Sequence, residues 1–165
     1  MRTAKTAKAS KPAKSCSSSR SLRVSVFIFA SLILASCARA ADPVDSIIDH
    51  AVAIQTSLAH DKMDGVASNA TAISTDAAAL GKPGEKIVAG AMALQTARQI
   101  GEARDAFGQM SEALVAYLNG QKRKPGNTVR IAFCPMKLKP WLQKEGAIQN
   151  PYYGSEMLTC GSFRQ

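Results

Sequence analysis

Between Asp42 and Asn119 the apolar residues recur at intervals of three and four positions, which is the period of one face of an α-helix. Four such runs follow one another along the chain. Their apolar positions are Ile47, Ala51, Ile54 and Leu58; Met63, Val66, Ala70, Ile73, Ala77 and Leu80; Ile87, Ala91, Leu94 and Ile100; and Phe107, Met110, Leu114, Tyr117 and Leu118. Short connections between amphipathic helices favour antiparallel neighbours. The pattern therefore predicts an antiparallel bundle of about four helices.

Beyond the fourth run the period changes. Large apolar residues at 129, 131 and 133 alternate with Arg130 and Ala132, which indicates a short strand with one buried face. The segment around Pro140 is interpreted as a loop. The Asn-Pro and Gly of residues 150–154 are typical of a turn, and residues 157–163 are predicted to return as the partner strand. We therefore expect a mainly α domain with a small two-stranded β cap over residues 128–165.

The first forty residues have the composition of an export signal. Basic residues precede an apolar run from Val24 to Ala35, and small residues follow it. This run is shorter than the roughly 20 residues that a membrane-spanning helix needs. Two processing sites compete: residues 38–40 form an A-x-A site that releases a chain starting at Ala41, and residues 34–37 resemble a lipobox that would leave Cys37 lipidated. We expect residues 41–165 to form one exported domain, either periplasmic or anchored as a lipoprotein that faces the periplasm.

The net charge belongs mainly to this signal. The whole chain has 21 basic and 12 acidic residues, but eight of the basic residues and no acidic residue precede Ala41. The remaining balance of 13 to 12 gives no basic footprint for nucleic acid. Residues 41–119 carry five basic and ten acidic groups, whereas residues 120–165 carry eight and two. We therefore expect a basic cap on an acidic body, with membrane contact only through a lipid anchor.

The cap contains two short sulfur motifs. Cys134 is followed two positions later by Met136, and Met157 precedes Cys160 by three positions. Soft thiolate and thioether ligands select ions such as Cu(I) over hard cations. The four residues therefore form a candidate metal site for Cu(I) or Ag(I), if the two predicted strands bring them together.

Two other interpretations of the cap stay open. In an oxidising compartment the two cysteines can form a structural disulfide. Trp141, Tyr152 and Tyr153 can also form an aromatic surface that docks a partner protein. An enzyme is not expected, because a thiol nucleophile needs an adjacent base and the two histidines, His50 and His60, lie far from both cysteines in the sequence. The cap also lacks a C-x-x-C pair and a glycine-rich phosphate loop.

Four motifs of the cap occur together: Cys134–Met136, Trp141–Lys144, Asn150–Gly154 and Met157–Gly161. In this combination the chain resembles an exported bacterial domain of unknown function, which occurs alone and as an appendage on adaptor subunits of copper and silver efflux pumps. The resemblance covers roughly residues 45–163. It implies metal handling, with an efflux-pump or envelope protein as partner. The segment between Met136 and Trp141 is shorter than in many members, which leaves the geometry of that loop open.

Overall fold

The structure, a computed structural model, describes residues 42–164, and the expected signal with its processing sites and Cys37 lies outside this part. The helices are α1 (Pro43–Ala59), α2 (Val66–Ala78), α3 (Glu85–Thr96) and α4 (Ile100–Gly120), with a 3₁₀ turn η1 (Lys82–Gly84) before α3. The cap contains β1 (Val129–Cys134), β2 (Lys139–Lys144), a second 3₁₀ turn η2 (Gly154–Glu156) and β3 (Ser162–Phe163). The prediction of a mainly α fold is confirmed. Over the described residues, no helix combines the length and the apolar character needed to cross a bilayer.

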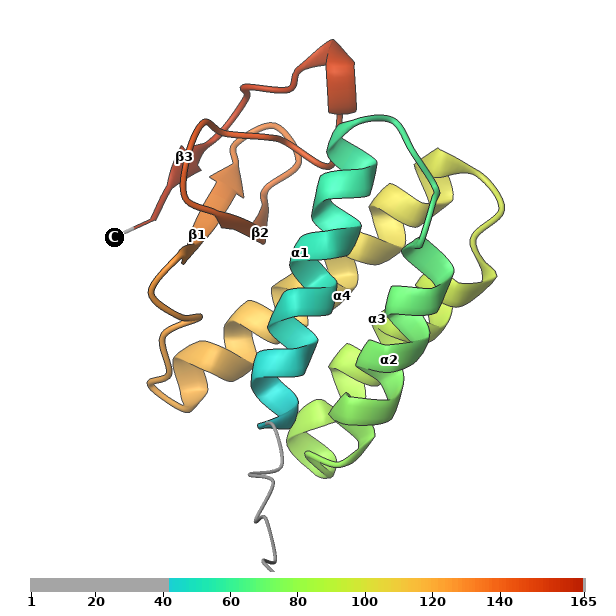
Figure 1. The fold of residues 1–165 in the computed structure, drawn as a ribbon, viewed down its shortest axis with the longest axis vertical. Helices are drawn as coiled ribbons and strands as arrows, with labels where there is room; N and C mark the ends of the chain where they lie inside the picture. The colour runs from blue at the N-terminus through green and yellow to red at the C-terminus, as the bar shows by residue number, and fades with distance from the viewer. Residues whose placement is uncertain (1–41, 165) are drawn as a thin grey trace, which may run out of the picture. The chain divides into compact units, whose positions relative to one another are not determined.

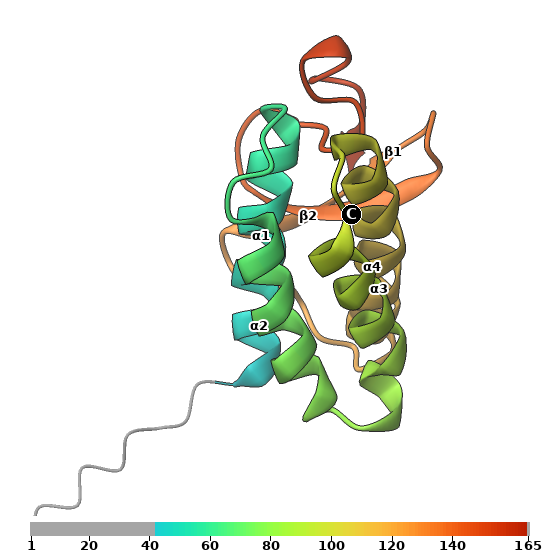
Figure 2. The same cartoon turned by 90° about the vertical axis from the view of Figure 1, so that its right-hand side faces the viewer.

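The helices form a bundle in which the chain direction alternates from each helix to the next (Figure 1). Viewed from the side, α1 and α2 lie together and α3 and α4 lie together (Figure 2). The sheet packs on α1 and α4 through β2, away from α2 and α3. The cap therefore covers one side of the bundle, and α1 and α4 are buried between the other two helices and the sheet.

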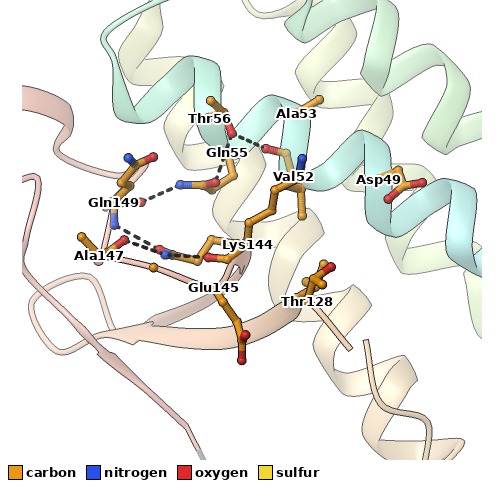
Figure 3. A pocket seen from close by; sticks show the side chains of 13 residues that line it. Asp49, Val52, Ala53, Gln55, Thr56, Thr128, Lys144, Glu145, Ala147 and Gln149 are labelled. Atoms are coloured by element: carbon orange, nitrogen blue, oxygen red, sulfur yellow. Dashed lines mark hydrogen bonds between the residues drawn. The ribbon is translucent and has the colours of Figure 1, made fainter. Parts of the chain in front are cut away.

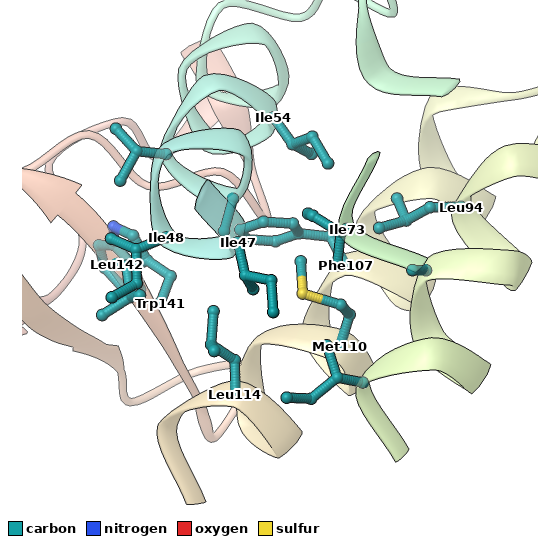
Figure 4. Packing of buried hydrophobic residues seen from close by; sticks show 14 of the residues in the cluster. Ile47, Ile48, Ile54, Ile73, Leu94, Phe107, Met110, Leu114, Trp141 and Leu142 are labelled. Carbon is teal, nitrogen blue, oxygen red and sulfur yellow. The ribbon is translucent and has the colours of Figure 1, made fainter. Parts of the chain in front are cut away.

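The predicted apolar stripes form the core. Ile54, Ile73, Leu94 and Leu114, one from each helix, have no exposed area. Figure 4 shows these side chains converging around Phe107 of α4. Aliphatic side chains buried in this way contribute about 1.5–3 kcal/mol each relative to an exposed position. The core continues into the cap through two buried residues of β2, Trp141 and Leu142.

The beginning of α1 and the junction before α4 carry distinct capping signals. At α1 the Asp42 carboxylate accepts the Val44 N–H at 2.9 Å, and Pro43 occupies the first turn. The third predicted run extended to Ile100, but α3 ends at Thr96 and Ile100 opens α4. A capping box starts the new helix, because the side chains of Gln99 and Glu102 each accept the backbone N–H of the other residue.

The sheet corrects the prediction for the cap, because it has three strands and not two. The strand order is β2-β1-β3, and both pairings are antiparallel. The segment interpreted as a loop around Pro140 is β2. A proline is tolerated there because β2 is an edge strand, where an outward N–H group has no ladder partner. The expected return strand exists, but only Ser162 and Phe163 pair with β1.

Ion pairs join the basic C-terminal part of the chain to the acidic helical bundle. Basic residues after α4 form ion pairs with acidic residues at the start of α1 and on α4, as expected for a basic cap on an acidic body. These pairs are Arg123 with Asp42 at 2.6 Å and with Asp45 at 2.5 Å, Lys137 with Asp105 at 2.8 Å, and Lys139 with Glu112. Each pair is partly exposed, and such pairs typically contribute only about 0–1 kcal/mol.

Candidate soft-metal site

The sheet brings the two cysteines together. Cys134 is the last residue of β1, and only Gly161 separates Cys160 from β3. Because Ser162 lies opposite Phe133 in the antiparallel register, the chain at Cys160 returns beside Cys134. Burial raises the pKa of the Cys160 thiol, and the neighbouring Cys134 thiol raises this pKa further. Both residues are free cysteines, Cys134 fully buried and Cys160 half-buried.

The buried sulfur of Cys134 accepts two N–H donors. The backbone N–H of Lys137, in the turn between β1 and β2, lies 3.4 Å from Sγ. The side-chain Nδ2 of Asn150 lies 3.3 Å from the same atom. Hydrogen bonds of this kind strengthen when the acceptor carries negative charge, so the surroundings of Cys134 suit a thiolate ligand.

Asn150 connects the two cysteines. Its side chain has no exposed area, and Nδ2 also donates to the Cys160 carbonyl oxygen at 2.6 Å. Its Oδ1 accepts the Tyr152 N–H at 2.8 Å. The sequence analysis missed this residue as part of the site, because Asn-Pro indicates a turn and no periodic pattern marks the Asn side chain as buried. One buried amide thus contacts the sulfur of Cys134 and the backbone of Cys160.

Two aromatic residues, Trp141 and Tyr152, pack next to the segment that carries Cys160. Trp141 is fully buried, donates its Nε1–H to Gln143 Oε1 at 3.0 Å, and packs edge-on against Tyr152 at 5.9 Å between ring centroids. Gly161 follows Cys160 at a φ of 145°, and a Cβ there would lie 2.5 Å from Cη2 of Trp141. Glycine is therefore required for the Cys160 segment to approach the indole ring.

The burial of Trp141 and Tyr152 bears on the hypothesis of an aromatic docking surface. Trp141 and Tyr152 belong to the core, so the hypothesis that they form an exposed docking surface is wrong for both. Tyr153 is half-buried. Burial also raises the pKa of the Tyr152 hydroxyl, which keeps this group neutral. The aromatic residues shape the protein around the cysteine pair instead.

The loop that carries Asn150 is fixed to the bundle by several hydrogen bonds, one of which runs from Arg104 Nε to the Pro151 carbonyl oxygen at 3.0 Å. Gln55 of α1 donates its side-chain N–H to the Gln149 carbonyl oxygen at 2.6 Å. Asp61, just after α1, accepts the Ser155 N–H at 3.1 Å and pairs with Arg104 of α4 at 2.5 Å. The hydrogen bonds from Ser155 and then Arg104 lower the pKa of Asp61 to about 2. These contacts hold the cap segment that precedes Cys160.

The two methionines of the predicted site occupy a different environment from the cysteines. Met136 is 63% exposed in the turn after β1, and Met157 is 37% exposed just after η2. Both side chains therefore reach solvent, whereas the thiols lie inward. Over residues 42–164, no three or more His, Cys, Asp or Glu side chains gather as a metal-binding group. The structure therefore places the two thiols next to each other and leaves the thioethers exposed to solvent.

A separate groove of about 870 Å³ lies between α1 and the end of β2. Figure 3 shows Asp49 of α1 on one side of it and Lys144 of β2 on another, with the bond from Gln55 to Gln149 at its end. Neither the cysteines nor the two cap methionines line this groove. Among the described residues, every buried side-chain nitrogen or oxygen has a hydrogen-bond partner.

The cysteine pair is the candidate site that the structure favours, since it combines ligand chemistry with a built environment. The pair draws on both sheet and loop: Cys134 comes from β1, Asn150 from the anchored loop and Cys160 from the segment before β3. No protein-family model, no curated protein and no solved structure matches this chain.

Proposed function

We propose that this protein is an exported, non-enzymatic module that binds one Cu(I) or Ag(I) ion on the thiolates of Cys134 and Cys160. The observation that carries the proposal is the meeting of two thiols that are distant in sequence, one buried and one accessible. Soft monovalent ions accept two sulfur ligands in a linear arrangement, and soft thiolates select them over hard cations. The half-buried Cys160 gives the ion access to the inner sulfur.

We assign an auxiliary role to Met136 and Met157. Their thioethers reach solvent on the two segments that carry the cysteines. A thioether needs no deprotonation, so it can capture an ion at a pH where a thiol is still protonated. Binding at the cysteines releases protons, and the raised pKa of Cys160 means that affinity for the ion increases as the pH rises.

The proposed location and partners follow from other features. Support for export is the basic, apolar and small-residue order of residues 1–40, which ends in a cleavage site or in a lipidated Cys37. The resemblance to the efflux-associated domain supports a link to metal efflux, with a pump component or envelope protein as partner. The module would take up or hand over its ion outside the cytoplasm.

The main rival is a structural disulfide between the same two cysteines. It requires the same proximity and is favoured by an oxidising compartment. It differs in one respect that can be tested, because a disulfide makes no use of Met136 or Met157. If the pair serves only as a cross-link, any Cu(I) binding by the reduced thiols should be indifferent to the loss of both methionines.

The deciding experiment is a titration of the fully reduced protein with Cu(I) against a competing chelator. We expect one ion per chain, with binding lost in Cys134→Ser and in Cys160→Ser. The double variant Met136→Ala, Met157→Ala should bind more weakly. Met92→Ala is its matched control, because Met92 is 56% exposed on α3 and belongs to neither segment. Failure of the reduced protein to compete for Cu(I), or binding that is unaffected by the loss of both methionines, refutes the proposal and leaves a cross-linked structural domain.

A further inference from the structure

The charge of the occupied site depends on the ion. Two thiolates and one monovalent ion leave one net negative charge, whereas two thiolates and one divalent ion leave none. Cys134 has no exposed area, so water cannot reach the charge on its sulfur. A buried charge is costly unless it is paired or hydrogen-bonded. The occupied site therefore needs protein donors for a monovalent ion more than for a divalent one.

The two lysine side chains that follow Cys134 form ion pairs with α4 and do not stabilise the charge of the site. Lys137 pairs with Asp105 at 2.8 Å, and Lys139 pairs with Glu112, both on α4. Two N–H groups instead donate hydrogen bonds to the Cys134 sulfur and would stabilise its negative charge: the backbone N–H of Lys137 and the side-chain N–H of Asn150. Of these, only the Asn150 donor belongs to a side chain.

The orientation of the Asn150 amide is fixed by its other partners. The Tyr152 N–H can only donate, so it requires the oxygen Oδ1 at 2.8 Å. The Cys160 carbonyl can only accept, so it requires Nδ2 at 2.6 Å. A flipped amide would break both bonds. Asn150 therefore always presents an N–H to the Cys134 sulfur, never a carbonyl oxygen.

We propose that Asn150 makes the cysteine pair selective for monovalent over divalent soft ions, because its N–H group stabilises the net negative charge of the monovalent complex. This inference rests on the proposed function and adds to it the basis of selectivity. Asn150 acts as a positioning residue through Cys134 and does not itself ligate the ion.

The test uses Asn150→Asp in the reduced, full-length protein. Aspartate has nearly the same shape and keeps an acceptor for the Tyr152 N–H, but its second oxygen can donate neither to the Cys134 sulfur nor to the Cys160 carbonyl. Affinities for Cu(I) and for Cd(II), a soft divalent ion, are measured against competing chelators at neutral pH. We expect Cu(I) binding to weaken roughly 10- to 100-fold, as for the loss of a hydrogen bond to a charged group. Cd(II) binding should stay unchanged or become tighter.

The control variant is Asn127→Asp, which makes the same chemical change at an exposed position before β1 and should alter neither affinity. Equal losses for both ions in Asn150→Asp would show that the residue only holds the loop, and would overturn the inference while the proposed function stands. Absence of Cu(I) binding by the unmodified protein would instead overturn the proposed function and this inference with it. If Asn150→Asp does not fold, Asn150→Leu decides, and a Cu(I)-to-Cd(II) affinity ratio equal to that of the unmodified protein refutes selectivity.

Discussion

Gly90 lies where α3 and α4 come closest, and its replacement by alanine should destabilise the protein. The residue is buried in the middle of α3. A Cβ at this position would lie 2.7 Å from both Cα and Cβ of Met110 and 2.8 Å from its backbone nitrogen. Backbone atoms of a helix cannot rotate away, so α3 and α4 would have to separate. Helix propensity alone predicts the opposite effect, because alanine is more stable than glycine in a helix interior.

The two effects can be compared in size. Alanine gains about 1 kcal/mol over glycine in a helix interior. Overpacking a well-packed core typically costs about 1–3 kcal/mol. Because the contact at Gly90 is with backbone, we take the upper part of that range and expect a net loss of about 1–2 kcal/mol. For a domain of this size this corresponds to a fall in Tm of roughly 4–8 °C.

The assay is thermal and urea unfolding of Gly90→Ala beside Gly101→Ala. Gly101 lies in the first turn of α4, and a Cβ there meets no atom within 4 Å. The control should therefore be as stable as the unmodified protein or up to about 1 kcal/mol more stable. If Gly90→Ala also proved neutral or stabilising, the close approach of α3 and α4 would be refuted.

Three further predictions concern the core, the cap anchor and the thiols. Leu114→Ala should lower the free energy of unfolding by about 2–5 kcal/mol in a urea titration, whereas Leu138→Ala, in an exposed turn, should change it by no more than about 0.5 kcal/mol. The Asp61 carboxyl has a folded-state pKa of about 2, below its ordinary value. The ionised carboxylate therefore stabilises the fold fully when the pH is above the ordinary pKa, and this stabilisation is lost as the pH falls through about 2. The stability difference between the unmodified protein and Asp61→Asn should therefore be constant near neutral pH and shrink on acidification from about pH 5, and a difference that does not shrink contradicts the assignment. In the reduced protein Cys160 should be alkylated before the fully buried Cys134, with a rate that rises with pH, and peptide mapping that finds Cys134 modified first would contradict the burial.

The helical part of this fold could be predicted because its signal is periodic. Each apolar stripe is repeated over several turns, so single exceptions do not hide it, and Ile47, Ala51 and Leu58 are all buried as expected. The boundary before α4 was harder, because residues 97–99 contain no Pro or Gly. The local signal there was the pair Gln99 and Glu102, whose side chains cap the helix.

The cap was predicted less completely because its elements are short and its packing decides them. Pro140 argues against a strand in isolation, yet it is acceptable at the edge of a sheet that packs on α1 and α4. The proximity of Cys134 and Cys160 followed from pairing two predicted strands. The role of Asn150 could not be anticipated, because a buried amide between two distant cysteines exists only in the folded chain.

The anchoring of the cap also bears on the order in which the protein can assemble. The bonds from Gln55 to Gln149 and from Asp61 to Ser155 each join residues that are 94 positions apart. During synthesis α1 emerges long before β2, which packs on it, and until then Ile48 and Val52, both buried in the finished protein, lack this cover. Contacts of such long range form late and slowly. A polypeptide that stops before β2 would therefore leave these apolar side chains of α1 exposed and prone to aggregation, and one that stops before residue 149 would lack both long-range bonds.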